Sequence, residues 1–570
     1  MIGALYEKYS YTFVFDFCAL GRSGVVSNRS ENLRWASTGS HCVEGGGESL
    51  EFQDKAFEYS VWRGERAYAQ AVVSSSVDLS EVSLSVSDLR NGKKSIPAEN
   101  ITLQFVSFVT SDLLDTTRFS QCGYREDKTK WGEVQVADIL DINEYASVPA
   151  GRMQPVWVTV SVPEDAKPGK YSGKLTVTAA NAKARSLPIE IRVADHVLPP
   201  VCDWTFHLDL WQNPYAVARL ESVPLWSEEH FEAMRPVMSL LADAGQKSVT
   251  ATLINRPWNG QTYDAFGSMV TKVRRIDGTW LFDYTIFDRW VEFMFSLGID
   301  RQINCYSMIP WAMEFDFYNQ ATGLNDCVRT VAGSPEYEEY WGRFIKDFAG
   351  HLREKGWFEK TMIAMDERPL DAMKAVLAVV RKYEPDFKVS LAGNYHEPVI
   401  FDIADFSEAF VFKKEFPEDV KLQRKELGLL TTFYTCCGEA HPNTFVISDP
   451  DESTWLGWFA VAENYDGYLR WAYNSWPEAP LTDVRFHSWP AGDCFIVYPG
   501  GRGSVHLAKL TEGIQDYEKI HILKKEWEKS GDGESLGRLE EVLGEFTADK
   551  VLAEGAGKAV KAAKSFLSEH

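Results

Sequence analysis

The first 197 residues alternate apolar and polar positions in short runs, and this pattern predicts β-strands. Residues 67–73 (AYAQAVV), 102–109 (TLQFVSFV) and 156–162 (VWVTVSV) follow the two-residue period of a strand with one buried face. Gly, Asn, Asp and Pro separate such runs, as in the Pro–Gly turn within residues 163–177. Short strands at regular spacing indicate a β-sandwich. The Leu-Pro-Pro sequence at 198–200 then stops strand pairing and marks a boundary.

From about residue 202 the pattern changes to apolar strands that alternate with amphipathic helices. Helices are expected after Ser227, after Ser334–Pro335 and from Pro369, because these residues favour helix starts. Eight strands are expected, at Trp204–Leu210, Lys247–Ile254, Arg301–Tyr306, Thr361–Met365, Lys388–Ala392, Ala409–Phe412, Leu429–Tyr434 and Gly467–Trp471. Eight strands with intervening helices over roughly 300 residues favour a (β/α)8 TIM-like barrel over an open sheet.

The chain is therefore predicted to be multidomain. An N-terminal all-β sandwich is expected at residues 1–197, a (β/α)8 barrel at 198–520 and a C-terminal helical cap at 521–570. The β module carries no cluster of catalytic side-chain types, so its expected role is to pack against the barrel. Catalytic groups are expected at the carboxyl ends of the barrel strands.

Composition narrows the choice of partners and compartment. The 570 residues are 45% apolar, which excludes intrinsic disorder, and a net charge of −23 argues against nucleic acid and anionic membrane surfaces. No apolar run reaches the roughly 20 residues of a membrane span, and the start MIGALYEKYSYTFVFDF lacks the features of a signal peptide. Nine cysteines are too few for a disulfide scaffold, and the vicinal pair Cys436–Cys437 is not expected to bridge. A periplasmic or secreted location is favoured, with the signal peptide absent from this sequence, and a cytoplasmic location is left open.

The sharpest candidate for chemistry is the segment Met365–Asp366–Glu367–Arg368–Pro369, where two carboxylates leave an apolar strand directly before a helix. Neighbours in a regular strand point to opposite faces, so both can face one pocket only if pairing ends and the backbone turns there. Close like charges separate two pKa values, so one group can donate a proton while the other stays anionic. An acidic helix start favoured by the helix dipole is the structural alternative.

Two adjacent carboxylates do not easily straddle a sugar ring, as the two carboxylates of ordinary glycosidases do. They suit substrate-assisted catalysis, in which a 2-acetamido carbonyl attacks the anomeric carbon while one carboxyl protonates the leaving oxygen and the other steadies the amide nitrogen. Catalysis is therefore assigned to Glu367 and Asp366. Substrate-binding candidates at other strand ends are hydroxyl donors, amides, one imidazole and aromatic walls: Tyr434, Tyr395, Asn394, Trp471, Trp311, Trp258, Gln212 and His207. Each tryptophan could equally serve packing, and a lone histidine is usually structural.

Metal, cofactor and nucleotide chemistry have no motif to support them. HExxH, GxSxG, GxGxxG after a strand and the P-loop pattern are missing from the sequence, and the proposed reaction needs neither metal nor cofactor.

The MDERP segment resembles that of glycoside hydrolase family 123, the β-N-acetylgalactosaminidases. Further similar segments are Trp62–Arg63–Gly64–Glu65, Gly492–Asp493, Tyr498–Pro499–Gly500 and Glu512–Gly513–Ile514–Gln515–Asp516–Tyr517–Glu518. The resemblance implies that Glu367 is the general acid/base and Asp366 the partner of the acetamido group. It also implies retention through an oxazoline intermediate, and terminal β-linked N-acetylgalactosamine of glycosphingolipid-type glycans as substrate.

Two alternatives remain at this level. The first is a glycosidase that combines Glu367 with a distant second carboxylate such as Glu314. The second is a glycan-binding protein with a degenerate site. Galacto versus gluco preference and oligomeric state are not decided by the sequence.

Overall fold

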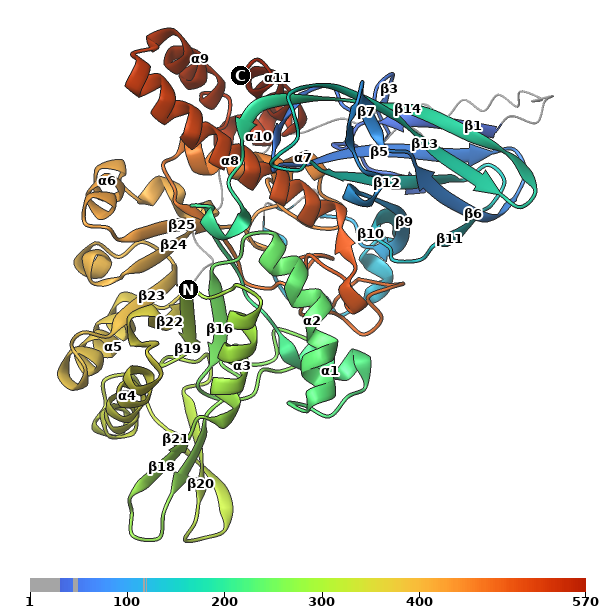
Figure 1. Ribbon diagram of the computed structural model, residues 1–570. Coiled ribbons are helices and arrows are strands. Elements are labelled where there is room, and N and C mark those ends of the chain that lie inside the picture. The colour runs from blue at the N-terminus through green and yellow to red at the C-terminus, as the bar shows by residue number, and fades with distance from the viewer. Residues whose placement is uncertain (1–30, 45–49, 116–117, 119) are drawn as a thin grey trace.

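The computed structural model describes residues 31–44, 50–115, 118 and 120–570 (Figure 1). The first 17 residues, where no signal peptide was expected, lie outside this part of the chain. Figure 1 shows the N-terminal strands in blue and teal beside the C-terminal helices in red, with the barrel in green, yellow and orange below them. No helix of the described residues is both long enough and apolar enough to cross a bilayer.

The N-terminal region consists of two sheets packed face to face. One contains β1 Glu31–Ala36, β2 Val43–Glu44, β3 Phe52–Gln53, β5 Arg66–Ser75, β9 Ile101–Ser111, β10 Val134–Leu140 and β12 Met153–Ser161. The other contains β4 Ser60–Arg63, β6 Leu79–Val86, β7 Leu89–Asn91, β8 Lys94–Ile96, β11 Tyr145–Val148, β13 Gly169–Ala179 and β14 Ala182–Val197. Inward positions of both sheets share one buried cluster, for example Val156 and Val158 of β12 with Leu175 of β13. The predicted alternation therefore produced two half-buried faces that cover each other.

Eight parallel strands form the nearly closed barrel. They are β15 His207–Leu210, β16 Ser248–Thr252, β19 Gln302–Tyr306, β22 Thr361–Asp366, β23 Lys388–Gly393, β24 Asp405–Ala409, β25 Leu430–Tyr434 and β26 Gly467–Arg470. The first and last strands of this sheet, β15 and β16, meet at a single bridge, where the Lys247 N–H donates to the Leu208 carbonyl at 2.9 Å. The arrangement is consistent with a TIM-like barrel.

Helices connect most of the strands. They are α1 Pro214–Glu221, α2 Glu228–Asp243, α3 Thr285–Ser296, α4 Pro335–Lys355, α5 Leu370–Tyr383, α6 Glu418–Glu426 and α7 Pro450–Ala462. Ser227 and Ser334 cap α2 and α4 as predicted, each accepting from a backbone N–H of the first turn. Two connections depart from the simple alternation, because a 3-10 helix, η5 Glu397–Asp402, follows β23, and η6 Phe410–Glu415 follows β24. The strand predicted at 409–412 was therefore misplaced, since β24 ends at Ala409.

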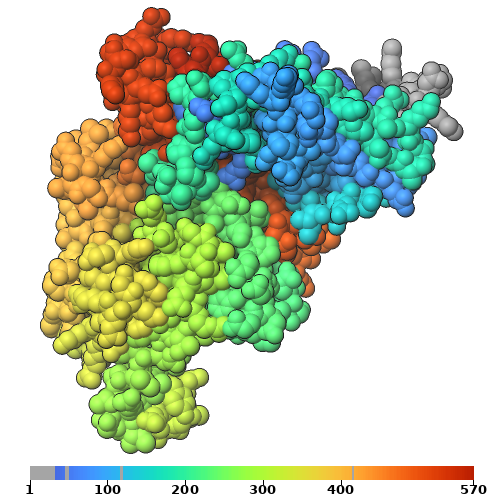
Figure 2. Space-filling view, in the orientation of Figure 1, coloured from blue at the N-terminus to red at the C-terminus, as the bar shows by residue number. Residues whose placement is uncertain are grey.

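Short 3-10 turns complete the connections, namely η1 Ala98–Asn100, η2 Lys128–Lys130, η3 Val201–Asp203, η4 Phe358–Lys360 and η7 Pro499–Gly501. A small four-stranded sheet leaves the barrel after β16 and β19, and it consists of β17 Thr271–Arg274, β18 Trp280–Asp283, β20 Glu314–Asn319 and β21 Leu324–Arg329. A hairpin through Asp277–Gly278 joins β17 to β18. Figures 1 and 2 show this sheet as a projection below the barrel.

The C-terminal part joins the barrel to the N-terminal sheets. It contains β27 Gly503–Ser504, α8 Val505–Ser530, α9 Gly533–Leu543, α10 Ala548–Glu554 and α11 Gly557–Leu567. β27 pairs with β10 of the N-terminal region, and a buried Lys519–Glu65 ion pair at 2.5 Å links α8 to the same region. The boundary predicted between residues 520 and 521 falls inside α8, which runs on without interruption.

Candidate active site

An apolar cluster lines the carboxyl end of the barrel. Each strand or the residues just after it supplies one member, and together these are Trp211, Trp258, Tyr306, Ala364, Ala392, Ala409, Tyr434 and Leu469. Trp211 stacks on Trp258 with ring centroids 5.1 Å apart, and Tyr306 lies 4.5 Å from Trp211. Small alanines occupy three neighbouring strands beside these large rings. We call this cluster the apolar floor; apolar and aromatic side chains commonly line ligand sites.

Asp366 and Glu367 lie at the edge of this floor, where β22 ends. Glu367 has a positive φ of 32°, so the backbone turns away from the strand directly after Asp366. The Glu367 N–H still donates to the Ala392 carbonyl at 2.7 Å, and a Cβ at Gly393 would lie 3.0 Å from the Glu367 Cα and N. Gly393 therefore permits the close approach that the turn requires. This is the end of pairing and the turn that the sequence predicted.

Asp366 is buried and held by two donors. The Trp311 indole N–H donates to Asp366 Oδ2 at 2.9 Å, and the Arg368 guanidinium lies 3.2 Å from Oδ1. Arg368 also lies over the Trp311 ring, 4.4 Å from its centroid. Burial raises the pKa of Asp366, while the charge of Arg368 and the hydrogen bond from Trp311 act in the opposite direction. The two donors thus favour the anionic form and partly offset burial, although the net shift of the Asp366 pKa is upward.

Glu367 has a different environment. Its side chain remains accessible to solvent, although protein atoms crowd its carboxyl. Desolvation and the neighbouring Asp366 raise the pKa of Glu367, and the Tyr434 hydroxyl, which donates to Oε1 at 2.9 Å, opposes this. No cation bonds it directly among the described residues, in contrast to Asp366. Glu367 therefore retains a proton to higher pH than an ordinary glutamate.

Further buried carboxyls surround this pair. The Trp471 indole N–H donates to Asp493 Oδ2 at 3.1 Å, and Arg470 lies 3.3 Å from the other oxygen. Burial raises the pKa of Asp493 to about 6, against the charge of Arg470, and Glu367 raises it further. Burial also raises the pKa of Glu439 well above its ordinary value, and the Cys436 N–H donates to it at 3.0 Å. These groups orient the loops that present Tyr434 and Trp471.

The structure brings four predicted substrate-binding residues to Asp366, Glu367 or the apolar floor. Tyr434 bonds Glu367, Trp311 bonds Asp366, Trp258 lies in the floor and Trp471 packs against it. Trp311 is 42% exposed, so its ring remains open to a ligand. Asn394 and Tyr395 follow β23 directly and are half-buried, and Tyr395 packs on Phe416 with ring centroids 5.2 Å apart.

The other two predicted residues lie elsewhere. His207 is the first residue of β15, at the amino end of the barrel, where it is buried beside the Ser248 hydroxyl at 3.2 Å. Gln212 is fully buried in the barrel wall. Its Oε1 accepts from the Thr250 N–H at 2.8 Å, and its Nε2 donates to the Leu210 carbonyl. Because its amide bonds the backbone of both β15 and β16, Gln212 helps to close the barrel and has no free group for a sugar.

Several residues of the site were not selected from the sequence, namely Trp211, Tyr306, Arg368, Asp493 and Glu439. Arg368 and Asp493 stand in the segments that carry the family resemblance, which could have indicated them. Trp211 and Tyr306 end barrel strands, and their position alone was the available signal. Among the described residues, no group of three or more His, Cys, Asp or Glu is arranged to hold a metal ion.

Two family models match the chain. The catalytic domain of glycoside hydrolase 123 matches residues 211–523, and the glycoside hydrolase 123 N-terminal domain matches residues 35–179. A family 123 glycoside hydrolase from Clostridium perfringens, described in work on glycolipid glycan hydrolysis, is similar in structure. The TM-score is 0.84 at 27% identity, over 95% of this chain and 98% of that chain.

Two further solved structures are much less similar. A family 39 glycoside hydrolase from Bacteroides cellulosilyticus WH2 has a TM-score of 0.35 and 10% identity, over 66% of this chain and 76% of that chain. A GH5 xyloglucanase from Bacteroides ovatus has a TM-score of 0.26 and 9% identity, over 80% of this chain and 98% of that chain. Neither value supports an inference about this chain, and no curated protein matches the sequence. The catalytic-domain match alone spans more than half of the chain, so the chain belongs to glycoside hydrolase family 123 and is a glycoside hydrolase.

Proposed function

We propose that this glycoside hydrolase removes terminal β-linked N-acetylgalactosamine by a retaining, substrate-assisted reaction. The observation that carries the proposal is the unequal environment of two adjacent carboxyls at the barrel mouth. Asp366 has Arg368 and Trp311 to stabilise its charge, whereas Glu367 has the neighbouring anion and a tyrosine hydroxyl. An anion beside a retained proton is the pair that substrate assistance requires.

The reaction then runs in two steps. Glu367 donates its proton to the glycosidic oxygen as the bond to the anomeric carbon breaks, and the substrate's own acetamido oxygen bonds that carbon from the opposite face. Asp366 accepts a hydrogen bond from the N–H of the acetamido group and stabilises the positive charge that develops on the oxazoline ring. Glu367, now ionised, takes a proton from water as the water opens the ring. Two inversions at one carbon leave the configuration unchanged.

The apolar floor supports this assignment, because an acetamido methyl group needs an apolar wall and a sugar ring needs an aromatic face. Trp258 and Trp211 are candidates for the wall, and Trp471 and Trp311 for a sugar platform. Asn394 and Tyr395 remain candidates for sugar hydroxyls. Glycolipid glycans as the source of the sugar follow from the family resemblance and from the Clostridium perfringens relative.

The alternative pair, Glu367 with Glu314, has a structural argument against it. Glu314 is exposed on β20 of the projecting sheet and forms an ion pair with Arg329 at 2.8 Å. Glu314 is exposed and already paired with a cation, so it is a weaker candidate for a nucleophile or base than Asp366, which lies beside Glu367.

A screen of four aryl β-glycosides tests the proposal. N-acetylgalactosaminide is expected to be hydrolysed fastest, N-acetylglucosaminide more slowly, and galactoside and glucoside not measurably, because only the first two carry the internal nucleophile. A thiazoline analogue of the oxazoline should inhibit competitively. Hydrolysis of the plain galactoside at a comparable rate, together with no thiazoline inhibition, would overturn the substrate-assisted mechanism.

Arg368→Met is expected to move both limbs of the pH profile of kcat/KM to higher pH. The acid limb reports ionisation of Asp366, and loss of an adjacent cation raises a carboxyl pKa by about one unit or more. Arg368 also lowers the pKa of Glu367, so the alkaline limb, which reports its proton, moves in the same direction by less. The measurement is initial rate against pH, with Arg343→Met on the surface of α4 as the control. A profile that moves downward, or does not move, contradicts the assignment of Asp366 as the anion.

A further inference from the structure

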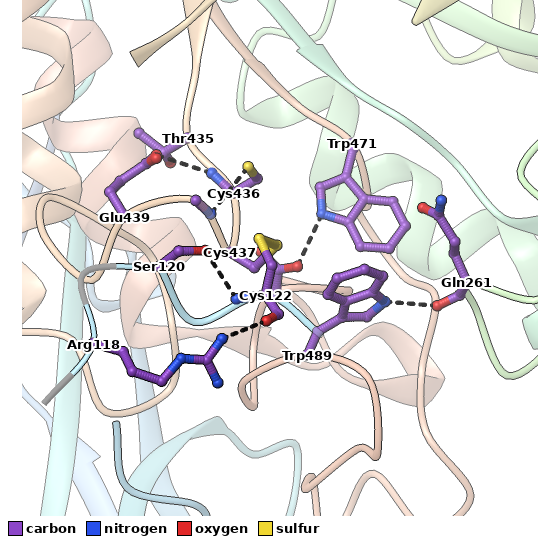
Figure 3. The surroundings of a disulfide bond; sticks show 12 residues. Arg118, Ser120, Cys122, Gln261, Thr435, Cys436, Cys437, Glu439, Trp471 and Trp489 are labelled. Atoms are coloured by element: carbon purple, nitrogen blue, oxygen red, sulfur yellow. Dashed lines mark hydrogen bonds between the residues drawn. A yellow bond between two sulfur atoms is a disulfide. The ribbon is translucent and has the colours of Figure 1, made fainter. Parts of the chain in front are cut away.

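A disulfide joins the N-terminal region to the barrel beside the candidate site. Cys122, in the β9–β10 connection, bonds Cys437, which comes three residues after Tyr434, and 315 residues separate the two cysteines (Figure 3). The Gln121 N–H also donates to the Cys437 carbonyl at 2.7 Å. We call residues 120–125, with this bond, the clamp. Cys437 thus pairs across two regions and not with its neighbour Cys436.

Arg125 fixes a second barrel segment to the clamp. Its guanidinium donates to the buried Asp112 at 2.5 Å and to the Trp489 carbonyl at 2.7 Å, and its N–H donates to the His487 carbonyl at 2.6 Å. Asp112 in turn accepts from the Ala491 N–H at 2.9 Å. One buried ion pair of the N-terminal region therefore sets the backbone of residues 486–491.

Both clamped segments present residues of the site. The segment after β25 follows directly on Tyr434, the last residue of that strand. The segment 486–491 carries Trp489, whose ring meets Trp471 edge to face at 5.8 Å. Asp493, two residues beyond this segment, receives the hydrogen bond from Trp471. In Figure 3, Trp471 and Trp489 lie side by side next to the disulfide. Displacement of residues 486–493 would therefore move Trp471, a candidate for the sugar platform.

The free thiol beside the disulfide is not suited to exchange with it. Burial raises the pKa of the Cys436 thiol well above its ordinary value, and the neighbouring Glu439, Asp493 and Glu367 raise it further. Exchange requires a thiolate. The bond therefore stays between Cys122 and Cys437 until an external reductant opens it.

We propose that the clamp is a positioning device, in which the intact Cys122–Cys437 bond holds Trp471 in place for the sugar through Trp489 and Asp493, and its reduction weakens substrate binding. The inference rests on the proposed function. Reduction breaks one S–S bond and yields two cysteine thiols, while a dithiol reductant supplies two electrons and two protons and becomes its cyclic disulfide. A loop freed at one end samples more conformations, and ordering it again opposes binding.

Reduction of the folded wild-type enzyme with dithiothreitol tests the device. KM for the aryl N-acetylgalactosaminide is expected to rise on the order of tenfold, because small misplacement of positioning groups has effects of this size or larger, while kcat changes by less than about twofold. Cys122→Ser/Cys437→Ser should show the raised KM without reductant and no further response to it. Cys202→Ser, which removes an exposed thiol, should behave as wild type before and after reduction.

Hydrogen exchange separates this inference from the proposed function. Amides of residues 435–443 and 486–493 should exchange faster in the reduced enzyme, whether or not the substrate is the one proposed. Faster exchange without turnover of any N-acetylhexosaminide would support the ordering of these segments by the clamp and would overturn the proposed function. Unchanged exchange in these segments, or an equal KM in both redox states, would overturn the clamp as a positioning device.

Discussion

Glu367→Gln is expected to lower kcat/KM for an N-acetylgalactosaminide with a poor leaving group by about 10²–10⁴-fold, the usual contribution of a general acid/base. The amide keeps the shape of the side chain and can still accept from Tyr434, but it cannot donate a proton to the glycosidic oxygen. Steady-state kinetics on aryl glycosides of graded leaving-group acidity measure the effect. With a dinitrophenyl leaving group, which departs without protonation, the first step should recover most of its rate.

Glu314→Gln is the matched control for this variant. It removes a carboxylate of the same size that lies exposed on β20 and is paired with Arg329. The substrate-assisted mechanism predicts near-normal kinetics for it, whereas a two-carboxylate mechanism that uses Glu314 predicts a loss as large as that of Glu367→Gln. A wild-type rate in Glu367→Gln across all leaving groups would contradict the assignment of Glu367 as the general acid/base.

Local sequence patterns predicted most elements of the barrel because the information lies within single elements. The Ser334–Pro335 start gives α4 a hydroxyl cap and a preset first turn, and the apolar face of the helix follows from its period. The exception at residues 409–412 is equally local. An apolar run shows that a segment is buried, but it does not distinguish a continuing strand from the 3-10 helix that begins at Phe410.

The candidate pair Asp366 and Glu367 was selected from the sequence because its two members are adjacent and precede a helix. The partners that give them different properties were harder to assign, since Trp311 comes from the connection after β19 and Tyr434 from the end of β25. The errors at His207 and Gln212 have a physical origin too. Strand β15 begins later than predicted, which places His207 at the amino end, and a glutamine can bond the backbone where a barrel closes as readily as it can bind a ligand.

The disulfide illustrates what spacing alone cannot predict. Nine cysteines gave no pattern, because the pairing of Cys122 with Cys437 depends on how the N-terminal sheets dock on the barrel. The same docking brings Arg125 to residues 486–491. The N-terminal region is therefore more than a support, since two of its side chains hold segments that shape the candidate site.

Asp366→Asn is expected to lower kcat/KM for N-acetylgalactosaminides by about 10²–10³-fold, as for removal of one group that stabilises developing charge. The asparagine keeps the hydrogen bond from Trp311 but has no negative charge for the acetamido nitrogen, and it leaves Arg368 without its counter-ion. The uncompensated cation would also oppose the positive charge of the oxazolinium ring. Affinity for the thiazoline inhibitor should therefore fall in parallel with kcat/KM.

The loss of kcat/KM and the loss of thiazoline affinity should be proportional if Asp366 acts on the acetamido group. A plot of log kcat/KM against log Ki for wild type, Asp366→Asn and Asp366→Glu should be close to linear, because the thiazoline copies the charge and shape of the intermediate. Asp371→Asn, in the first turn of α5, removes a nearby carboxylate without contact to the pair and should leave both values unchanged. If Asp366→Asn binds the thiazoline as tightly as wild type while turnover falls, Asp366 acts on Glu367 and not on the acetamido group. That result would contradict the assignment of Asp366 as the partner of the acetamido group.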